Sequence, residues 1–121
     1  MPQYRTPGKG SKYYVPKEEY LTVLHFCKQY PDWEKEISDS IEQGAMFSQE
    51  SDPVRIAAIR KKKAFLEMTI QKSADGMDEW LFLGVCHGLT YPQLKQRGIP
   101  IGRNQYYELR QRFYYYMSRI I

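Results

Sequence analysis

The stretch "GLTYPQLKQRGIPIGRNQYYELRQRFYYYMSRII", residues 88–121, decides the fold of this chain. Thr90, followed by a proline inside the first turn, predicts a helix of about two turns. Gly98 and Pro100 then predict a tight bend, because glycine tolerates positive φ and proline keeps the residue before it out of the helical region. A longer helix is expected to begin near Arg103 and to continue to the end of the stretch.

The longer helix has an apolar side and a polar side. Aromatic and aliphatic residues recur at helical spacing and should face the interior, namely Tyr106, Leu109, Phe113, Met117 and Ile120. The polar side is expected to contain Asn104, Glu108, Gln111 and Tyr115, flanked by Gln105, Tyr107 and Arg112. Ile99 and Ile101 should fill the corner between the two helices. The pattern therefore predicts a helix-turn-helix whose second helix presents polar side chains from its first turns.

This arrangement favours recognition of double-stranded DNA. The major groove admits one α-helix, and Asn or Gln can pair with adenine while Arg pairs with guanine. The side chains expected to face bases are those of Arg103, Asn104, Gln105 and Glu108; those expected to contact the DNA backbone are Arg97, Tyr107, Arg110 and Arg112, with Gln111 further along the polar side. The recognition helix is expected to span residues 103–119. The alternative is that these residues form the solvated face of an ordinary amphipathic helix.

Charge is segregated along the chain. The whole sequence has a formal net charge of +4, but residues 13–50 carry a net charge of −5 and residues 95–121 a net charge of +5. A basic end of this kind predicts a polyanion as partner. The lysines at 61–63 are expected mainly on a solvated face, with contact to the DNA backbone as the alternative.

The part of the chain before residue 76 reads as amphipathic helices. Residues 13–43 are predicted to form a helical hairpin that turns at Pro31, with Asp32 capping its second helix. Tyr20 and Trp33 are expected in the core; the alternative is that this acidic segment is a surface for RNA polymerase or for self-association.

A further helix is expected to start at Asp52 and Pro53, with an N-cap followed by an N1 proline. Its inward residues should be Ala58, Ile59, Leu66 and Ile70. An apolar helix over residues 77–87, ended by Gly88, should lie in the middle of the core.

No stretch alternates with the period of a strand over enough residues for a sheet, so the sequence predicts an all-α fold, a small helical bundle with a C-terminal helix-turn-helix. Three parts are expected. Residues 1–12 should form a flexible N-terminal arm, residues 13–75 a helical part for oligomerisation or partner binding, and residues 76–121 the DNA-binding part.

Several classes of function are excluded by the sequence. No apolar run is long enough to span a membrane, and the N-terminus lacks a signal-peptide pattern, so a cytoplasmic protein is expected. Cys27 and Cys86 are expected to be buried thiols, and their spacing to His25 and His87 does not suit zinc. No catalytic motif, cofactor motif or metal motif stands out, so the chain is not expected to be an enzyme.

Two resemblances are carried by the C-terminal residues. "GLTYPQL" and "GIPIGRNQYYELRQRF" are similar to the region 4 helix-turn-helix of bacterial sigma factors. Most of residues 17–121, including "CKQYPDWEKEI", "IRKKKAFLEMTIQK" and "IGRNQYYELRQRFYYYMSRI", resembles the phage late-operon transcriptional activators of the RinA and ArpU type. The resemblance implies binding to a promoter and activation of phage or prophage late genes in a bacterial host cytosol, with the candidate residues of the recognition helix facing DNA.

Two other functions stay open at this stage. A phage small terminase subunit also joins a helix-turn-helix to helical oligomerisation segments. A protein-interaction module, such as an anti-repressor, would use the basic helix on an acidic protein surface without binding DNA. Host RNA polymerase and a second copy of the chain are the further partners considered, and no cofactor is expected.

Overall fold

The computed structural model describes the backbone of residues 12–46 and 52–120, so most of the expected N-terminal arm lies outside the described residues. The described part is all-α, as predicted, and contains no strand. Its helices are α1 (Lys17–Lys28), α2 (Tyr30–Met46), α3 (Pro53–Ser73), α4 (Asp78–Cys86), α5 (Tyr91–Gln96) and α6 (Arg103–Ile120). Within these residues, no helix is both long enough and apolar enough to cross a membrane.

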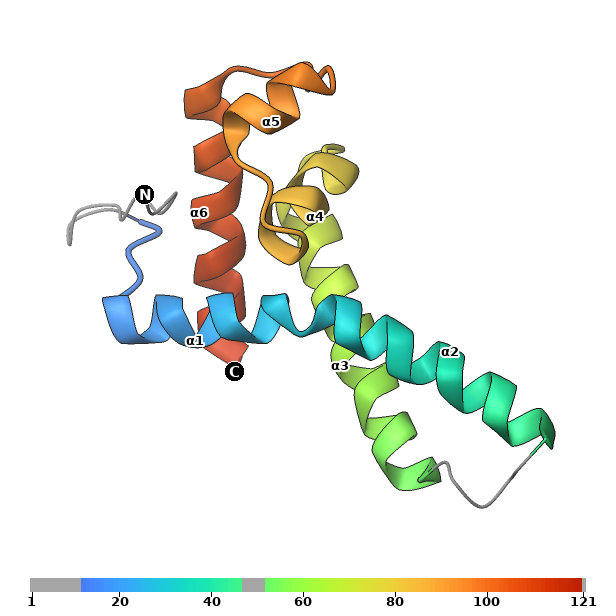
Figure 1. Ribbon diagram of the computed structural model, residues 1–121. Helices are drawn as coiled ribbons and strands as arrows, with labels where there is room; N and C mark the ends of the chain where they lie inside the picture. Colours follow the sequence, from blue (N-terminus) through green and yellow to red (C-terminus); the bar gives the residue numbers. More distant parts are fainter. Residues whose placement is uncertain (1–11, 47–51, 121) are drawn as a thin grey trace.

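The prediction that residues 13–43 form a helical hairpin was wrong. Helices α1 and α2 follow one another almost end to end, and α2 then lies beside α3 (Figure 1). Pro31 sits in the first turn of α2, where the missing proline N–H costs no helical hydrogen bond, and the Trp33 N–H donates to the Gln29 carbonyl at 2.9 Å. Asp32 therefore lies inside the first turn of α2 instead of capping it.

Helix α3 begins where the sequence indicates. The Asp52 carboxylate accepts hydrogen bonds from the N–H groups of Val54 at 3.0 Å and Arg55 at 3.3 Å. Ile59, Leu66 and Ile70 are buried as expected. Ala58 was expected to point inward but is exposed, because α3 packs mainly through the side that carries Leu66, Thr69 and Ser73. The helix ends in a turn in which Asp75 and Gly76 both have positive φ, at 48° and 86°.

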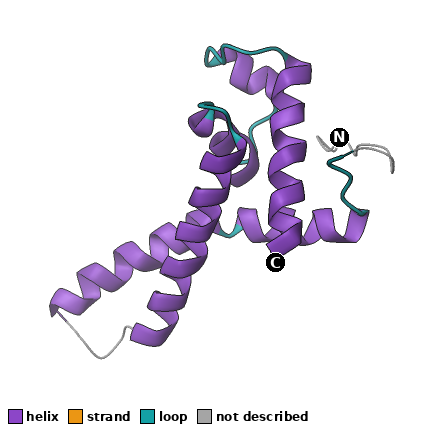
Figure 2. Cartoon of the chain, turned by 180° about the vertical axis from the view of Figure 1, so that it is seen from behind, coloured by secondary structure: helices purple, strands orange, loops and turns teal. Residues whose placement is uncertain are grey.

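The core has two parts, and α6 joins them. The larger cluster draws residues from α1, α2, α3, α4 and the C-terminal half of α6, where Phe113, Tyr114 and Met117 are buried. The smaller cluster lies between α4, α5 and the start of α6 and contains Tyr91, Leu94, Ile99, Tyr106 and Tyr107. The larger cluster thus crosses residue 75, the boundary expected between the two helical parts. Figure 2 shows α6 from behind, beside α1 and α3.

Several smaller predictions are settled by burial. Tyr20 and Trp33 are in the core, with 4% and 5% of their surface exposed, so they are not available to a partner. Ile120 was expected in the core but is 63% exposed at the last turn of α6. Cys27 and Cys86 are free, buried thiols as expected. A hydrogen bond with the Cys27 thiol, together with burial, raises the pKa of Cys86, so its reactive thiolate form is disfavoured.

Candidate nucleic-acid interface

Helix α5 is closed at both ends by local hydrogen bonds. The Thr90 hydroxyl accepts from the Gln93 N–H at 3.2 Å, and the Gln93 side-chain oxygen accepts from the Thr90 N–H at 2.8 Å, which is a capping box. At the C-terminal end, Gly98 adopts φ 96°. The Ile99 N–H donates to the Leu94 carbonyl at 3.1 Å, as in a Schellman motif. Because Ile99 and Leu94 are both buried, this turn has a fixed direction.

The turn after α5 is tied back to the start of that helix. The Tyr91 hydroxyl donates a hydrogen bond to the Ile101 carbonyl at 2.8 Å. The Arg103 guanidinium lies over the Tyr91 ring, 5.3 Å from its centroid. Helix α6 then begins, with the Tyr106 N–H donating to the Gly102 carbonyl at 3.0 Å. The first turns of α6 are therefore held in a defined orientation relative to α5.

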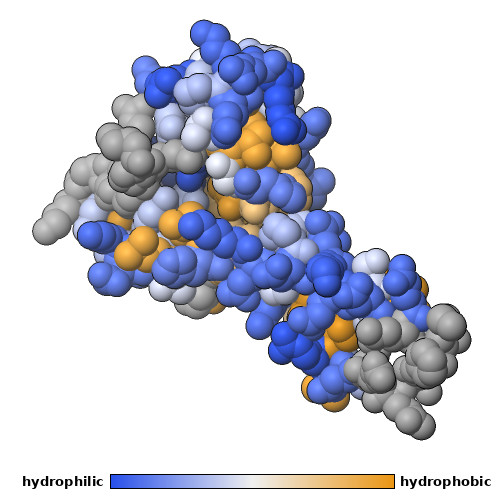
Figure 3. All heavy atoms as spheres, viewed as in Figure 1, coloured by the Kyte–Doolittle hydropathy of each residue, from blue (hydrophilic) through white to orange (hydrophobic). Residues whose placement is uncertain are grey.

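A polar surface covers this end of the molecule, as Figure 3 shows over α5 and the start of α6. Its residues include five of the nine that the sequence proposes for DNA contact, all exposed, namely Arg97, Arg103, Asn104, Gln105 and Glu108. Asn104 and Glu108 face outward while Phe113 and Met117 have no exposed surface, which is the orientation that a groove-binding helix requires. We call these five residues the polar end.

Tyr107 and Arg110 lie elsewhere than expected. Only 7% of Tyr107 and 5% of Arg110 is exposed, so neither is placed to reach a phosphate. The Arg110 guanidinium lies 5.6–5.9 Å from the ring centroids of Tyr106, Tyr107 and Tyr114, and it donates to the Tyr114 hydroxyl at 3.3 Å. The faces of three aromatic rings thus stabilise a buried positive charge. Burial lowers the pKa of Arg110 while Tyr114 and Tyr106 raise it, with a raised pKa as the net result, so this residue stays charged.

Arg112 is also engaged inside the protein. Its guanidinium donates to the Asp75 carboxylate at 3.0 Å and to the Ser73 carbonyl at 3.3 Å, and only 19% of its side chain is exposed. It therefore fastens α6 to the turn after α3, where the last carbonyls of a helix lack partners of their own. These bonds disfavour the phosphate contact expected of Arg112, which stays a prediction. Gln111, the remaining candidate, is half-buried.

We expect Arg112→Met to lower the free energy of unfolding by about 2 kcal/mol, because the buried Ser73 carbonyl loses its charged donor while the methionine retains most of the packing. Asp75→Ala is the control and should cost less, since Asp75 is 66% exposed and the Arg112 guanidinium keeps its bond to the Ser73 carbonyl when the carboxylate is removed. Urea unfolding followed by circular dichroism measures both. Equal costs for the two variants would show that the surface ion pair, and not the carbonyl, is what matters.

Because Arg110 is buried and Arg112 is bonded within the protein, fewer basic side chains are exposed in residues 95–121 than the sequence indicates. In the part of the chain that the structure describes, residues 95–108 contribute three exposed cations, Lys95, Arg97 and Arg103, and one acid, Glu108. Lys95 was not among the predicted contacts, although its place in the last turn of α5 could have indicated it. The N-terminus of α6 adds the partial positive charge of a helix dipole. The polar end thus keeps a positive potential with few acids nearby.

A close contact between Tyr106 of α6 and Gly84 of α4 has no recognisable sequence motif. A Cβ added at Gly84 of α4 would lie 1.8 Å from the Tyr106 hydroxyl oxygen, so the tyrosine packs directly on the glycine backbone. Tyr106 is 1% exposed, and its hydroxyl has no hydrogen-bond partner among the described residues. The only signal in the sequence is a glycine inside an apolar helix, which typically marks close packing.

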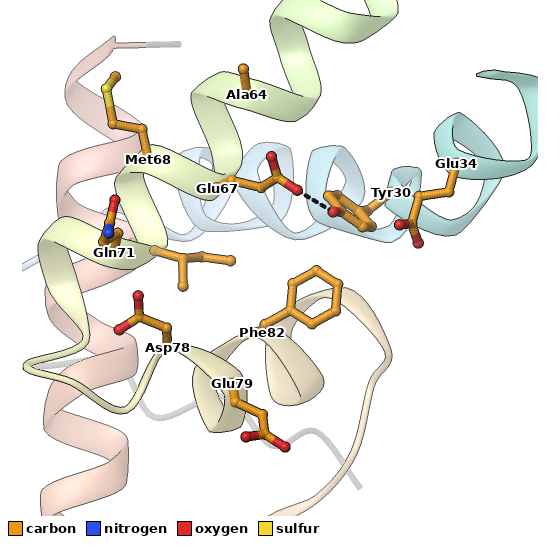
Figure 4. A pocket seen from close by; sticks show the side chains of 10 residues that line it. Tyr30, Glu34, Ala64, Glu67, Met68, Gln71, Asp78, Glu79 and Phe82 are labelled. Atoms are coloured by element: carbon orange, nitrogen blue, oxygen red, sulfur yellow. Dashed lines mark hydrogen bonds between the residues drawn. The ribbon is translucent and has the colours of Figure 1, made fainter. Parts of the chain in front are cut away.

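A concave region lies where α2, α3 and α4 meet, with a volume of about 700 Å³. Figure 4 shows Glu34, Glu67, Asp78 and Glu79 around the Phe82 ring, with the Tyr30 hydroxyl donating to Glu67. Four acidic residues repel phosphate, so this pocket does not extend the polar end. In the described part of the chain, no group of three or more His, Cys, Asp or Glu residues could hold a metal ion.

The lysine cluster at 61–63 divides in the structure. Lys61 and Lys62 are exposed on α3, whereas Lys63 is half-buried, bonded to Glu67 at 3.3 Å and placed over the Tyr30 ring. The cluster lies on a different helix from the polar end.

Comparison with protein-family models, with curated proteins and with solved structures finds no match to this chain.

Proposed function

We propose that this protein is a sequence-specific double-stranded DNA-binding regulator of transcription, in which the first turns of α6 enter the major groove. The observation that carries the proposal is the polar end itself. Hydrogen-bonding side chains suited to base edges occupy the exposed side of the N-terminal turns of α6, and their backbone is held by α5 and by the smaller core cluster.

The chemistry of each exposed residue supports a division of roles. Arg103, Asn104, Gln105 and Glu108 are proposed to face bases, since they stand on the first two turns of α6. Arg97 and Lys95, at the end of α5, are proposed to contact phosphates, because residues flanking a groove-bound helix usually do so. Tyr107, Arg110 and Arg112 have no contact role in this proposal, since they are buried or bonded within the protein.

The test is selection of bound sequences from a random duplex library, followed by affinity measurements on the selected site. The wild-type protein should select a defined sequence. Asn104→Ala should relax the preference at one base pair by roughly tenfold, since a bidentate Asn–adenine pair is worth ~1–3 kcal/mol of discrimination. The control is Gln71→Ala, an exposed amide on α3. Enrichment of no sequence, or the same loss with Gln71→Ala, would contradict the proposal.

The role in activation is proposed from the sequence resemblance to phage late-operon activators. A reporter driven by the selected site separates it from the terminase alternative, because an activator raises transcription and a packaging subunit does not. A protein-interaction module would instead show no duplex binding that falls with salt.

A further inference from the structure

The α2–α3 hairpin, residues 34–42 and 52–68, projects away from the rest of the molecule (Figures 1 and 2). Among the described residues, four large hydrophobic side chains are exposed, and three of them are on this hairpin. Ile41 is 61% exposed, Val54 79% and Met68 62%. Ile41 lines a groove between the two helices and Met68 lines the pocket of Figure 4, so exposed apolar surface on this hairpin favours a partner.

One face of the hairpin is a groove of about 390 Å³ between its two helices. It is lined by Glu34, Ile37, Ser38 and Ile41 from α2 and by Arg60, Lys63, Ala64 and Glu67 from α3. Ile37, Ile41 and Ala64 are its apolar residues; Lys63 is paired with Glu67, which leaves Glu34 on the α2 side and Arg60 on the α3 side as the charges that differ. The groove meets the acidic pocket of Figure 4, because Glu34, Ala64 and Glu67 line both.

The two helices of the hairpin carry opposite charge. Helix α2 has five acidic residues and one lysine, and α3 has six basic residues and one glutamate. A single ion pair in the described residues joins the two helices, between Arg55 and Glu36 at 2.7 Å. Lys35 with Asp39, and Lys63 with Glu67, bond within their own helices. Arg60, Lys61 and Lys62 are exposed on α3, and Glu34 and Glu42 are exposed on α2.

We propose that the partner on this face is a second copy of the same chain, with α2 of each copy lying on α3 of the other. A symmetric pair of stacked hairpins has two arrangements. A two-fold axis that lies in the plane of contact and runs perpendicular to the two helices places α2 on α2, which opposes like charges. An axis parallel to the hairpin places α2 on α3 and α3 on α2, which opposes acid and base at both contacts. The charge distribution selects the second arrangement.

The chosen axis has two structural consequences. Rotation about an axis parallel to the hairpin does not change position along it, so Glu34 of one copy comes opposite Arg60 of the other. It also leaves both copies of the polar end on the same side of the dimer. At 1.5 Å per residue, the α2 part of the hairpin is about 14 Å long and the α3 part about 26 Å, and two helices about 10 Å across make it about 20 Å wide. A contact of that size is at the small end of specific interfaces, so a weak, micromolar dimer is expected.

The experiment measures oligomeric state without DNA, so its outcome is independent of the proposed DNA binding. Sedimentation velocity at increasing concentration should show a monomer–dimer equilibrium for the wild-type protein. Glu34→Lys alone, and Arg60→Glu alone, should each weaken the dimer at least tenfold, because each places like charges at both symmetric contacts. An equimolar mixture of the two variants should recover it, because both contacts of the mixed dimer then pair Lys with Glu or Glu with Arg.

Two controls keep the result interpretable. Thermal unfolding checks that each variant keeps its fold, which is expected because both positions are exposed. Ile41→Asp should also give a monomer, since its apolar side chain lies in the proposed contact. A wild-type protein that stays monomeric at high concentration would overturn the proposal and leave this face to a different protein. A dimer unaffected by these variants, or two variants that fail to recover on mixing, would overturn it as well.

Discussion

Gly84→Ala is expected to lower the free energy of unfolding by about 3 kcal/mol, at the upper end of the usual cost of overpacking a core. The new methyl carbon would lie 1.8 Å from the Tyr106 hydroxyl oxygen and 3.1 Å from the ring carbon that carries it. Neither side of this contact can move freely. Tyr106 is 1% exposed, and Gly84 lies inside α4 with its neighbour Val85 buried. Relief therefore requires α4 and α6 to separate.

A second substitution distinguishes this clash from a general weakness of α4. Tyr106→Phe alone should be nearly neutral, because it removes a buried hydroxyl that has no hydrogen-bond partner among the described residues. In the Tyr106→Phe background, Gly84→Ala should cost much less than in the wild-type protein, because the closest atom is gone. Chemical unfolding of the four proteins gives the coupling. Additive costs would show that Tyr106 does not pack on Gly84.

The combined replacement of Arg97 and Arg103 by alanine is expected to weaken binding to duplex DNA roughly 100-fold, from two charged contacts of ~1.5 kcal/mol each. Both arginines are exposed at the polar end, one at the end of α5 and the other in the first turn of α6. The share of the lost affinity that comes from phosphate contacts should be the same for every duplex sequence. The slope of log affinity against log salt, about −2 per copy for the two proposed phosphate contacts of Lys95 and Arg97 in the wild-type protein, should become less steep by about 1, because Arg103 is proposed to face a base.

The matched control is Arg119→Ala. Arg119 is exposed in the last turn of the same helix, where it donates to the Tyr115 hydroxyl at 2.9 Å. Removing it changes the net charge of the protein but leaves the polar end intact, so the salt slope should keep its wild-type value. A proportionate change with Arg119→Ala would indicate that the total charge of the protein governs binding. In that case, the placement of the interface at the start of α6 is wrong.

Local signals predicted the ends of the helices well. Asp52 before Pro53, Thr90 before Tyr91, and the glycines at 88 and 98 all act where their backbone chemistry indicates, since caps and positive φ depend on a few adjacent residues. The partner of each helix was harder to predict. Pro31 is compatible both with a turn between packed helices and with the first turn of a helix, and tertiary packing of α2 on α3 decides between them.

In the candidate site, too, features set by adjacent residues were predicted and features set by tertiary packing were not. Residues at the start of α6 are exposed as predicted, since none of the described helices covers them. Arg110, in contrast, was assigned to DNA by its residue type and not by its angle on the helix. It stands four residues after Tyr106 and three before Phe113, which is the inward side of α6. Arginine is seldom buried without a partner, and here the partners are aromatic rings brought together by the fold. Arg112 depends on a turn 37 residues earlier in the chain, which no local pattern reveals.

The central claim is that duplex DNA contacts the end of α5 and the first turns of α6. The most direct measurement follows the backbone amide signals of the isotope-labelled protein by NMR as a selected duplex is added. The account predicts that the largest shifts fall within residues 95–108, with little change at residues 115–120 or at residues 34–42. Shifts concentrated at the far end of α6 or on the α2–α3 hairpin, or no shifts with any duplex, would contradict it.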